Sequence, residues 1–413
     1  MASFRNVFIA LAIATALVVA ALIVQSRRPR IEVVQARPEA VLATGKCASC
    51  HRRETAAIVE EFERSRHAAA GTTCLDCHGL VEGQQRFEHR GFVLTREVTA
   101  KNCSQCHARE YQEFLRSRHA APAYAAVLGP SAFTPAQVAF SEQYNPGAVQ
   151  RAANPLTGLE GRAAIAAGCV SCHSIGKPNA DGSIGACTAC HARHRGSVAL
   201  ARLPETCGQC HMGPDHSQLE IYRESKHGIL FNAFRGEMRL DVPPNRLTVA
   251  DMPVPTCSTC HMSGLGGGSA THDPGTRLSY YLFAEISQRR PTHRQGRDAM
   301  IAVCENCHTA PHIQRFFEQA ESVVTSVNGR VQAAQAVMGG LRARGLLTPT
   351  PLDEPIEYTY FDFWHYSGRT AKHGAFMGGA DFVQWHGNYE LVKGMVELQA
   401  QAAELGARRA GTR

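Results

Sequence analysis

The sequence has no cysteine outside one repeated pattern, and it has few aromatic and few charged residues. All 16 Cys of the 413-residue chain belong to Cys-x-x-Cys-His, so none is left to form a disulfide framework. Aromatic residues make up 7% and charged residues 19% of the chain. This composition is poor for one large apolar core, so we expect the chain to fold around cofactors. The net charge of +7 is modest and indicates no nucleic-acid partner.

The Cys-x-x-Cys-His pattern is typical of covalent c-type haem attachment. On one helical turn, the two thiols reach the two haem vinyl groups and the following imidazole lies under the iron. Zinc sites also use Cys-x-x-Cys pairs, but they need no His after each pair. The sequence therefore predicts eight c-type haems, each with a proximal His, at Cys47-Cys50-His51, Cys74-Cys77-His78, Cys103-Cys106-His107, Cys169-Cys172-His173, Cys187-Cys190-His191, Cys207-Cys210-His211, Cys257-Cys260-His261 and Cys304-Cys307-His308.

Seven further histidines lie in settings typical of distal axial ligands. Three share the phrase Ser-Arg-His or Ser-Lys-His, each at the end of a predicted amphipathic helix. One follows the fifth motif by three residues, too close to cap the same haem, and is expected to cap a neighbour. The other three lie in short polar or Gly-flanked loops. The three in the shared phrase are His67, His119 and His227, the one after the fifth motif is His194, and the three in loops are His89, His272 and His373.

Seven distal candidates for eight haems leave one haem without a distal histidine. A haem iron with two histidine ligands suits electron transfer, whereas an iron with an open position can bind and convert a small molecule. The sequence also has five spare histidines, any of which could supply the eighth ligand: His216, His293, His312, His365 and His386. An enzyme and a pure electron conduit therefore both stay open at this point.

From about residue 40 to about residue 400, the chain resembles the octahaem hydroxylamine oxidoreductase family. The specific stretches are CVSCH at 169–173, CTACHARH at 187–194, RLPETCGQCHMGPDH at 202–216, EIYRESKHG at 220–228 and the ATHD…TRLSYYLF region at 270–283. The resemblance implies that the fourth haem, on Cys169, Cys172 and His173, is five-coordinate and catalytic.

The resemblance also implies a catalytic pocket of Asp215, His216 and a tyrosine, best matched by Tyr281 with Tyr280 as the fallback. Such side chains suit the chemistry, because conversion of hydroxylamine or nitrite moves protons along with electrons. Two plainer readings remain. Asp215 could cap a helix and His216 could ligate a haem, and Tyr281 could be a core aromatic.

Oxidase members of the family carry a further tyrosine that ties the catalytic haem to an adjacent subunit. Here Phe382 aligns with that tyrosine, and phenylalanine has no oxygen to form the bond. A gap placed differently could bring Tyr389, Tyr366 or Tyr360 into register. Without the cross-link, the resemblance favours the members thought to reduce nitrite or hydroxylamine.

The amino terminus carries the longest apolar run of the sequence. Residues 7–24 form 18 uncharged, almost wholly apolar residues, and Arg27, Arg28 and Arg30 follow without a small-x-small cleavage site. We interpret residues 1–30 as a transmembrane helix that anchors the chain, with a cleaved signal as the alternative. The flanking charge bias favours the opposite orientation, but thioether attachment of haem requires a periplasmic main body.

The fold class is expected to be mainly α-helical: a multihaem cytochrome c fold, with short helices and long loops around packed haems in 40–312 and long helices in 313–408. Residues 313–341 show a heptad seam of the kind that packs helices together. The seam either packs on its own subunit or forms a trimer interface, which the resemblance favours. Its members are Ile313, Phe317, Ala320, Val324, Val327, Val331, Ala334, Met338 and Leu341.

Two functions fit these observations. The first is a periplasmic octahaem oxidoreductase that converts nitrite or hydroxylamine, with reduction favoured, at one open haem served by seven bis-histidine haems. The second is a conduit of eight bis-histidine haems between a membrane quinol oxidase and a partner. For either, the expected redox partner is a quinol-linked membrane cytochrome or a soluble cytochrome c. Tetrathionate or sulfite reduction is disfavoured, because those families differ in motif order and this chain has no Cys-x-x-Cys-Lys site.

Overall fold

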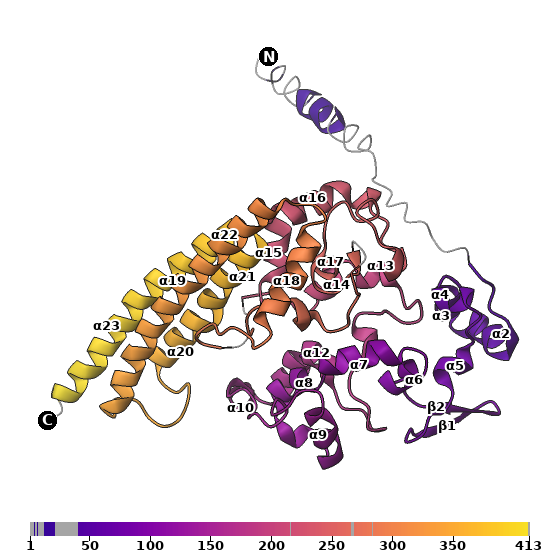
Figure 1. Ribbon diagram of the computed structural model, residues 1–413, viewed down its shortest axis with the longest axis horizontal. Helices are drawn as coiled ribbons and strands as arrows, with labels where there is room; N and C mark the ends of the chain where they lie inside the picture. The colour runs from indigo at the N-terminus through magenta and orange to yellow at the C-terminus, as the bar shows by residue number, and fades with distance from the viewer. Residues whose placement is uncertain are drawn as a thin grey trace.

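The computed structural model describes residues 4, 6, 12–20, 40–214, 216–265, 268–282 and 284–411. The described chain is mainly helical and contains a single two-stranded sheet. The region with the Cys-x-x-Cys-His motifs leads into a long bundle of carboxyl-terminal helices at one end of the molecule (Figure 1). The predicted mainly α-helical class with long carboxyl-terminal helices is therefore confirmed.

The motif region consists of short elements joined by loops. Its helices are α2 Gly45–Glu54, α3 Ala56–Glu63, α4 Arg66–Ala69, α5 Cys74–His78, α6 Ala100–Ser104, α7 Ala108–Arg116, α8 Ala121–Leu128, α9 Pro135–Glu142, α10 Leu156–Glu160, α11 Arg162–Ala167, α12 Cys169–His173, α13 Val198–Ala201, α14 Pro204–Gly208, α15 Gln218–Glu224, α16 Lys226–Phe234, α17 Cys257–His261 and α18 His293–Cys304. The strands are β1 Arg86–His89 and β2 Phe92–Thr95.

Threonine caps set the start of two motif helices. In α5, Thr73 and Asp76 form a capping box, so the helix begins at Cys74 directly after the cap. Thr256 and Thr259 do the same for α17, which begins at Cys257. The cap satisfies backbone donors of the first turn, and it places both cysteines and the proximal histidine within one short helix.

The Ser-Arg-His and Ser-Lys-His phrases lie at junctions between helices. Ser65 and Ser225 cap α4 and α16, and their hydroxyls accept hydrogen bonds from the backbone of Ala68 at 3.1 Å and Gly228 at 3.2 Å. His67 and His227 therefore lie in the first turn of a new helix, rather than at the end of the preceding helix as predicted. Each serine is buried, so the junction holds its histidine in a fixed position.

The sheet is a hairpin with register Arg86 opposite Thr95 and His89 opposite Phe92. Arg90 and Gly91 form the connecting turn and both have positive φ, at 49° and 85°, as a tight two-residue hairpin loop requires. His89, which was expected in a loop, thus lies at the end of β1.

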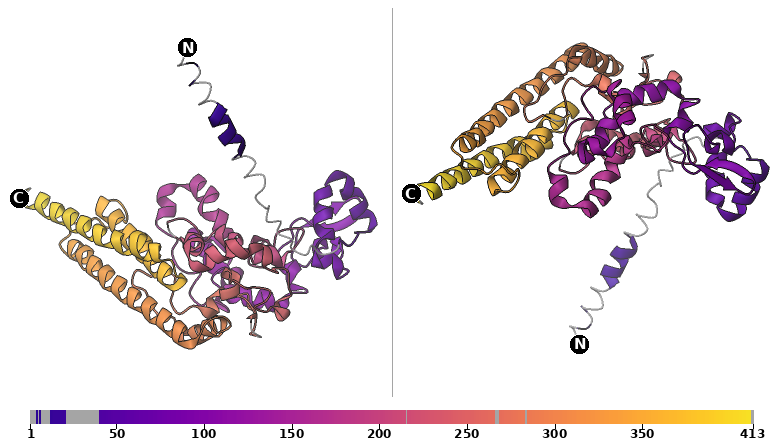
Figure 2. Two further views of the ribbon diagram at one scale, coloured as in Figure 1. Left: turned by 90° about the horizontal axis from the view of Figure 1, so that it is seen from above. Right: turned by 90° about the horizontal axis from the view of Figure 1, so that it is seen from below.

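The carboxyl-terminal bundle is built around one long helix, α19 Ala310–Ala343. The other elements are α20 Pro355–Phe361, the π-helical η8 Asp362–Gly368, α21 Arg369–Met377, α22 Ala380–Val383, the π-helical η9 Gln384–Tyr389 and α23 Glu390–Gly411. Figure 2 shows α19 and α23 side by side along the bundle, and the two helices contact each other.

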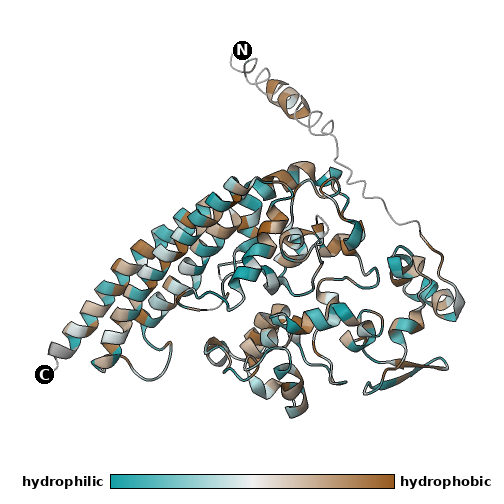
Figure 3. Cartoon of the chain, in the orientation of Figure 1, coloured by the Kyte–Doolittle hydropathy of each residue, from teal (hydrophilic) through white to brown (hydrophobic). Residues whose placement is uncertain are grey.

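All nine residues of the predicted heptad seam are buried. From Val327 to Leu341 the seam packs with residues of the other bundle elements, such as Ile356 and Leu391, in one hydrophobic core. Apolar and polar residues alternate along these helices accordingly (Figure 3). The seam is therefore covered by its own chain and is not available as a trimer interface.

The predicted membrane anchor falls only partly on described residues. Residues 12–20 are helical, while 7–11 and 21–24 lie outside the described residues. Among the described helices, none has the length and apolar character needed to span a bilayer. The transmembrane helix expected from the sequence is therefore not found in this part of the chain.

Candidate functional site

Five predicted proximal histidines lie opposite a predicted distal histidine. Two imidazoles on opposite sides of one iron have ring centres about 6 Å apart, given nitrogen–metal bonds of about 2 Å. The observed separations are 5.9–6.4 Å for the pairs His51 with His89, His107 with His67, His78 with His194, His191 with His272 and His308 with His227. The residues at the first, second, third, fifth and eighth motifs therefore fit a haem iron with two histidine ligands.

The proximal histidine of the sixth motif, His211, has two imidazoles at similar distances. The ring centre of His119 lies 5.8 Å away and that of His216 lies 6.1 Å away. Only one ring can take the position opposite His211 on an iron. The geometry therefore admits either His119 or His216 as the cap of the sixth haem.

His373, on α21, is buried and has one ring nitrogen available for a metal. The amide nitrogen of Gln218 lies 3.2 Å from Nδ1 of His373, and Gln218 also hydrogen-bonds His211. Nε2 of His373 is buried and has no hydrogen-bond partner among the described residues. Burial, aided by the positive charges of Lys372 and Arg369, lowers the pKa of His373. The ring is therefore neutral, which is the form that ligates iron.

Three half-buried proximal histidines are also neutral. Burial lowers the pKa of His191 and of His261 to about 4, and that of His211 to about 3. At the fourth motif, Nδ1 of His173 lies 2.5 Å from the carbonyl oxygen of Ala123 on α8. This contact directs the other ring nitrogen toward a metal, as is typical of haem and zinc histidines.

The cysteines of different motifs are neighbours in a fixed order. Thiols lie within hydrogen-bonding reach between the third and fifth motifs, the sixth and seventh, and the fourth and sixth. Electrostatic contacts link the first with the second, the second with the third, the fifth with the sixth, and the seventh with the eighth. The motifs thus form a chain, and the fourth motif branches from it beside the sixth.

The structure distinguishes the two candidate tyrosines. The Tyr280 hydroxyl donates to Glu321, and its ring lies 5.7 Å from that of Phe376, tilted by 47°. Tyr281 is half-buried, its backbone nitrogen bonds Gln288 at 3.0 Å, and its carbonyl oxygen lies 3.4 Å from Nζ of Lys372. Tyr280 therefore has a structural partner, and Tyr281 stays the better candidate for the site.

Two positively charged residues, Arg118 and Lys372, lie near Tyr281. Burial lowers the pKa of Arg118, and the neighbouring Arg151 and Arg290 lower it further, while the Tyr281 phenol acts in the opposite direction. On the carbonyl side of Tyr281, Lys372 is only 3% exposed. Burial, and then the charge of Arg369, lowers the pKa of Lys372 to about 7. Tyr281 thus has a cation near its phenol and another at its carbonyl oxygen, and Asp273 is an anion that acts on the first of them.

The predicted Asp215-His216 pair is described only in part, because Asp215 lies outside the described residues. His216 is half-buried and directly precedes Ser217, which contacts Thr370 of α21 through their hydroxyls at 3.3 Å. His216 also interacts electrostatically with His373. Together with the thiol contact between Cys172 and Cys210, these contacts bring His216, α21 and the fourth motif into one neighbourhood.

The four other spare histidines have different settings. His293 contacts the carbonyl oxygen of Arg290 at 3.0 Å, and His312 stacks on His308 at 4.8 Å, too close for the two rings to share an iron. His365 is buried, and its Nε2 lies 2.8 Å from Arg369. His386 is exposed and pairs with Asp381 at 3.2 Å.

The position aligned with the cross-linking tyrosine is not at the surface. Phe382 is buried and its ring lies 4.8 Å from that of His386. Of the alternative tyrosines, Tyr360 is buried and donates a hydrogen bond to Glu285 at 2.8 Å, and Tyr366 is half-buried. Tyr389 is 48% exposed, and its ring lies 5.4 Å from that of Trp385, tilted by 57°.

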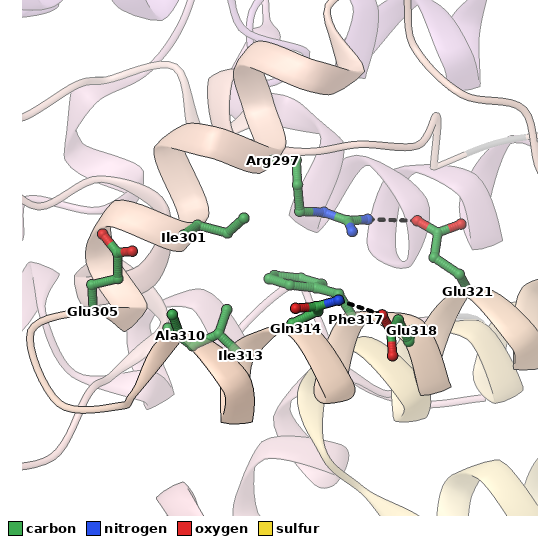
Figure 4. Close-up of a pocket in the computed structure, with 9 residues that line it drawn as sticks. All are labelled: Arg297, Ile301, Glu305, Ala310, Ile313, Gln314, Phe317, Glu318 and Glu321. Atoms are coloured by element: carbon green, nitrogen blue, oxygen red, sulfur yellow. Dashed lines mark hydrogen bonds and ion pairs between the residues drawn. The ribbon is translucent and has the colours of Figure 1, made fainter.

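A cavity of about 570 Å³ opens between α18 and the start of α19 (Figure 4). Apolar side chains such as Phe317 form its floor, and the ion pair of Arg297 with Glu321, at 2.6 Å, lies at one side. Its lining includes none of the predicted haem ligands or catalytic residues. Glu321 connects the cavity to the site, because it also accepts hydrogen bonds from Tyr280 and Arg289.

Sequence reasoning missed three residues of this neighbourhood: Gln218, Lys372 and Arg118. Gln218 begins a short helix and carries no motif. Lys372 and Arg118 each directly precede a predicted distal histidine, His373 and His119. That adjacency was the only local signal, and nothing in the linear pattern shows that the two cations approach the same tyrosine.

Residues 70–355 match the family described as "Seven times multi-haem cytochrome CxxCH", and this range holds seven of the eight motifs. The chain is also similar to a Kuenenia stuttgartiensis protein described as a probable nitrite reductase-hydroxylamine oxidoreductase fusion protein. The two are 27% identical over 373 residues, which cover 75% of this chain and 39% of the relative. The chain thus spans about two fifths of that relative's length.

Two solved structures share the fold. One is a hypothetical multiheme protein, with a TM-score of 0.75 and 21% identity, covering 92% of this chain and 100% of the other. The second is a reducing HAO-like protein complex of Kuenenia stuttgartiensis, with a TM-score of 0.66 and 22% identity, covering 89% of this chain and 85% of the other. At these identities the likeness shows the fold alone.

Proposed function

Because the chain belongs to the multihaem cytochrome family with Cys-x-x-Cys-His haem motifs, we propose that it is an octahaem oxidoreductase that converts a small nitrogen compound. The reaction takes place at the haem of Cys169, Cys172 and His173. The seven other haems carry electrons to or from it. Nitrite or hydroxylamine is the substrate, and reduction is the favoured direction.

The placement of the distal histidines carries this proposal. Five of the seven lie opposite the proximal histidines of other motifs. We assign His119 as the cap opposite His211, because it ends the same Ser-Arg/Lys-His phrase as His67 and His227, which lie opposite the proximal histidines of the third and eighth motifs. By elimination, we assign His373, with Nε2 available, as the cap of the haem of His261. With these assignments, the seven distal histidines cap the seven haems other than the fourth.

The side chains beside the fourth motif support a catalytic role. A haem bound there supplies electrons and an open coordination position. His216 and Tyr281 hold protons that reduction of nitrite or hydroxylamine consumes, and Asp215 is proposed as the partner of His216. The surrounding cations stabilise negative charge next to Tyr281. Because the fourth motif branches from the chain of motifs, a haem held there can be the end point for electrons that pass along the other haems.

The direction of reaction rests on Phe382 and on the names of related proteins. Phe382 cannot form an ether or similar bond to a haem, and its burial against His386 leaves it inside the chain. The Kuenenia stuttgartiensis proteins that this chain resembles are described as a nitrite reductase-hydroxylamine oxidoreductase fusion and as a reducing complex. Both observations favour reduction.

We place the protein in the periplasm, since thioether attachment of haem occurs outside the inner membrane. Its proposed electron partner is a quinol-linked membrane cytochrome or a soluble cytochrome c. The homotrimer is also a proposal, and the exposed apolar residues of the last helices, Trp385, Tyr389, Val392 and Val396, are the surface we assign to it. Light scattering of the wild type and of Val396→Glu tests this assembly.

Two variants test the catalytic site. Tyr281→Phe and His216→Ala are expected to reduce nitrite and hydroxylamine turnover by about a hundredfold, the scale of a lost proton donor, while eight haems stay attached by intact mass. His386→Ala is the control, because His386 is exposed. Full activity in both variants would show that His216 and Tyr281 are not catalytic residues. A new high-spin haem in His216→Ala would instead identify His216 as the cap of the sixth haem.

A further inference from the structure

Lys372 is a buried cation at the junction of the bundle and the motif region. It lies on α21, which packs against α15, the helix that follows His216 (Figure 1). Its side chain is 3% exposed. Arg369, one helical turn earlier, is 2% exposed, so two buried positive charges lie on the same face of one helix.

The described chain supplies little to balance the charge of Lys372. The ammonium has one hydrogen-bond acceptor, the carbonyl oxygen of Tyr281, at the long distance of 3.4 Å. Among the described residues, none of the carboxylates forms an ion pair with it. The ammonium is thus directed toward the backbone of the candidate catalytic tyrosine.

A buried ammonium in these surroundings is stabilised by an anion. Burial of a charge is costly unless the charge is paired and hydrogen-bonded. Arg369 adds positive charge next to Lys372, and Arg118 adds positive charge next to the Tyr281 phenol. A negatively charged group that enters this neighbourhood therefore gains the attraction of several cations, of which Lys372 and Arg369 are buried.

We propose that Lys372 is the residue that recognises an anionic substrate at the site, and that it makes the site selective for nitrite over uncharged hydroxylamine. This inference rests on the proposed function, because it assumes that the small nitrogen compound binds beside Tyr281. The ammonium takes one oxygen of a small oxyanion. Hydroxylamine, which is uncharged at neutral pH, gains no comparable attraction.

Two sources could supply the oxyanion chemistry that Lys372 recognises. One is free nitrite, and the other is a propionate carboxylate of a neighbouring haem. The two sources predict different results. Only the first makes nitrite affinity depend on Lys372, whereas the second makes a haem midpoint potential depend on it.

The test uses the haem-loaded full chain and two probes, nitrite and hydroxylamine, titrated into the ferric protein with optical and EPR detection. Lys372→Met removes the charge and keeps most of the volume, and Lys372→Arg keeps the charge. Lys393→Met is the matched control, because Lys393 is exposed and lies in α23. Haem content by intact mass and the midpoint potential of each variant are measured in parallel.

We expect Lys372→Met to weaken nitrite binding at least about tenfold, and to change hydroxylamine binding by less than about twofold. Lys372→Arg retains nitrite affinity within about threefold, and Lys393→Met changes neither ligand. Because a buried charge is replaced by an apolar group, Lys372→Met keeps its haem content and its thermal stability.

Four results would overturn the inference. Unchanged nitrite affinity with a displaced midpoint potential would assign Lys372 to a haem propionate. An equal loss of both ligands in Lys372→Met, not rescued by Lys372→Arg, would assign it to packing. If the wild type responds to neither ligand, the proposed function fails and this inference with it. A wild type that binds both, with an unaltered Lys372→Met, overturns the inference alone.

Discussion

The imidazoles of His78 and His194 lie 6.2 Å apart and within 20° of parallel, although His194 follows the fifth motif in the chain and His78 belongs to the second. The backbone nitrogen of His194 donates to Glu61 at 3.0 Å, which ties this loop to α3. A histidine three residues after one proximal ligand therefore faces the proximal ligand of another motif. The fold thus requires haems of distant motifs to be packed closely together.

This relationship predicts the effect of His194→Ala. The haem of His78 is expected to lose its sixth ligand, so one of eight haems becomes high-spin while eight remain attached. EPR of the ferric protein and intact mass measure the two quantities. His386→Ala, in which an exposed histidine is removed, should leave the spectrum unchanged. An unchanged spectrum for His194→Ala would show that His194 is not the cap.

The buried serine caps predict a stability effect that is local to the distal histidines. Ser225→Ala removes the hydroxyl that accepts from Gly228 at 3.2 Å. The loss of an N-cap is expected to reduce the free energy of unfolding by about 1 kcal/mol. It should also perturb the haem of His308, whose predicted cap His227 lies in the same turn. Thermal unfolding and EPR test both effects.

Ser322→Ala is the control for this cap, since Ser322 is exposed on α19 and bonds only the carbonyl oxygen of Gln319. If Ser225→Ala lowered stability with no change at any haem, the junction would be a simple helix cap. The proposed link between the serine and the ligand position would then be wrong.

Asp181 predicts a pH-dependent contribution to stability. Burial raises its pKa, but hydrogen bonds from Ser183, Thr99 and Gln84, at 2.6–3.0 Å, outweigh burial and the net pKa lies below the ordinary value. A depressed folded-state pKa stabilises the protein above the unfolded-state value of about 4. The contribution is lost as pH falls through the lower, folded-state pKa.

Asp181→Asn should therefore lower the free energy of unfolding by about 1 kcal/mol at pH 7, a figure discounted for the partial exposure of the carboxylate. The difference from the wild type should shrink as pH falls below about 4. Thermal unfolding at several pH values measures it, with Asp298→Asn as an exposed control. A constant difference down to pH 2 would contradict the assignment.

Glu321 is expected to position the segment that carries Tyr281. It accepts hydrogen bonds from Tyr280, Arg289 and Arg297, and Tyr280 is the chain neighbour of Tyr281. Glu321→Gln should reduce turnover about tenfold and change nitrite binding less, because displacement of a catalytic group affects the reaction step most. Glu318→Gln is the control on the same helix. Equal activity of the two variants would show that Glu321 does not position Tyr281.

Local sequence patterns predicted the haem motifs, but only long-range packing decides which histidine faces which motif. His67 and His227 share a phrase, yet one faces the third motif and the other the eighth. Each approach depends on how separate helices meet, and neither flanking sequence contains that information. The same limit applies to Lys372, whose proximity to Tyr281 arises only when α21 packs beside the segment of residues 278–290.

The heptad seam shows a related limit. The spacing of residues such as Val331 and Met338 predicted the helix and its apolar face, and α19 has both. Periodicity says which face must be covered, but not by which partner. Here the partners are α20, α21 and α23 of the same chain. The seam is not a trimer interface here, because helices of the same chain cover it.

The central claim is that one haem, at the fourth motif, binds the substrate. The most direct measurement is an EPR and optical titration of the ferric protein with nitrite and with hydroxylamine. We predict one high-spin haem in eight that responds to ligand, and loss of that response in His173→Ala. Eight low-spin haems that respond to neither ligand would contradict the account, and the protein would then be an electron conduit.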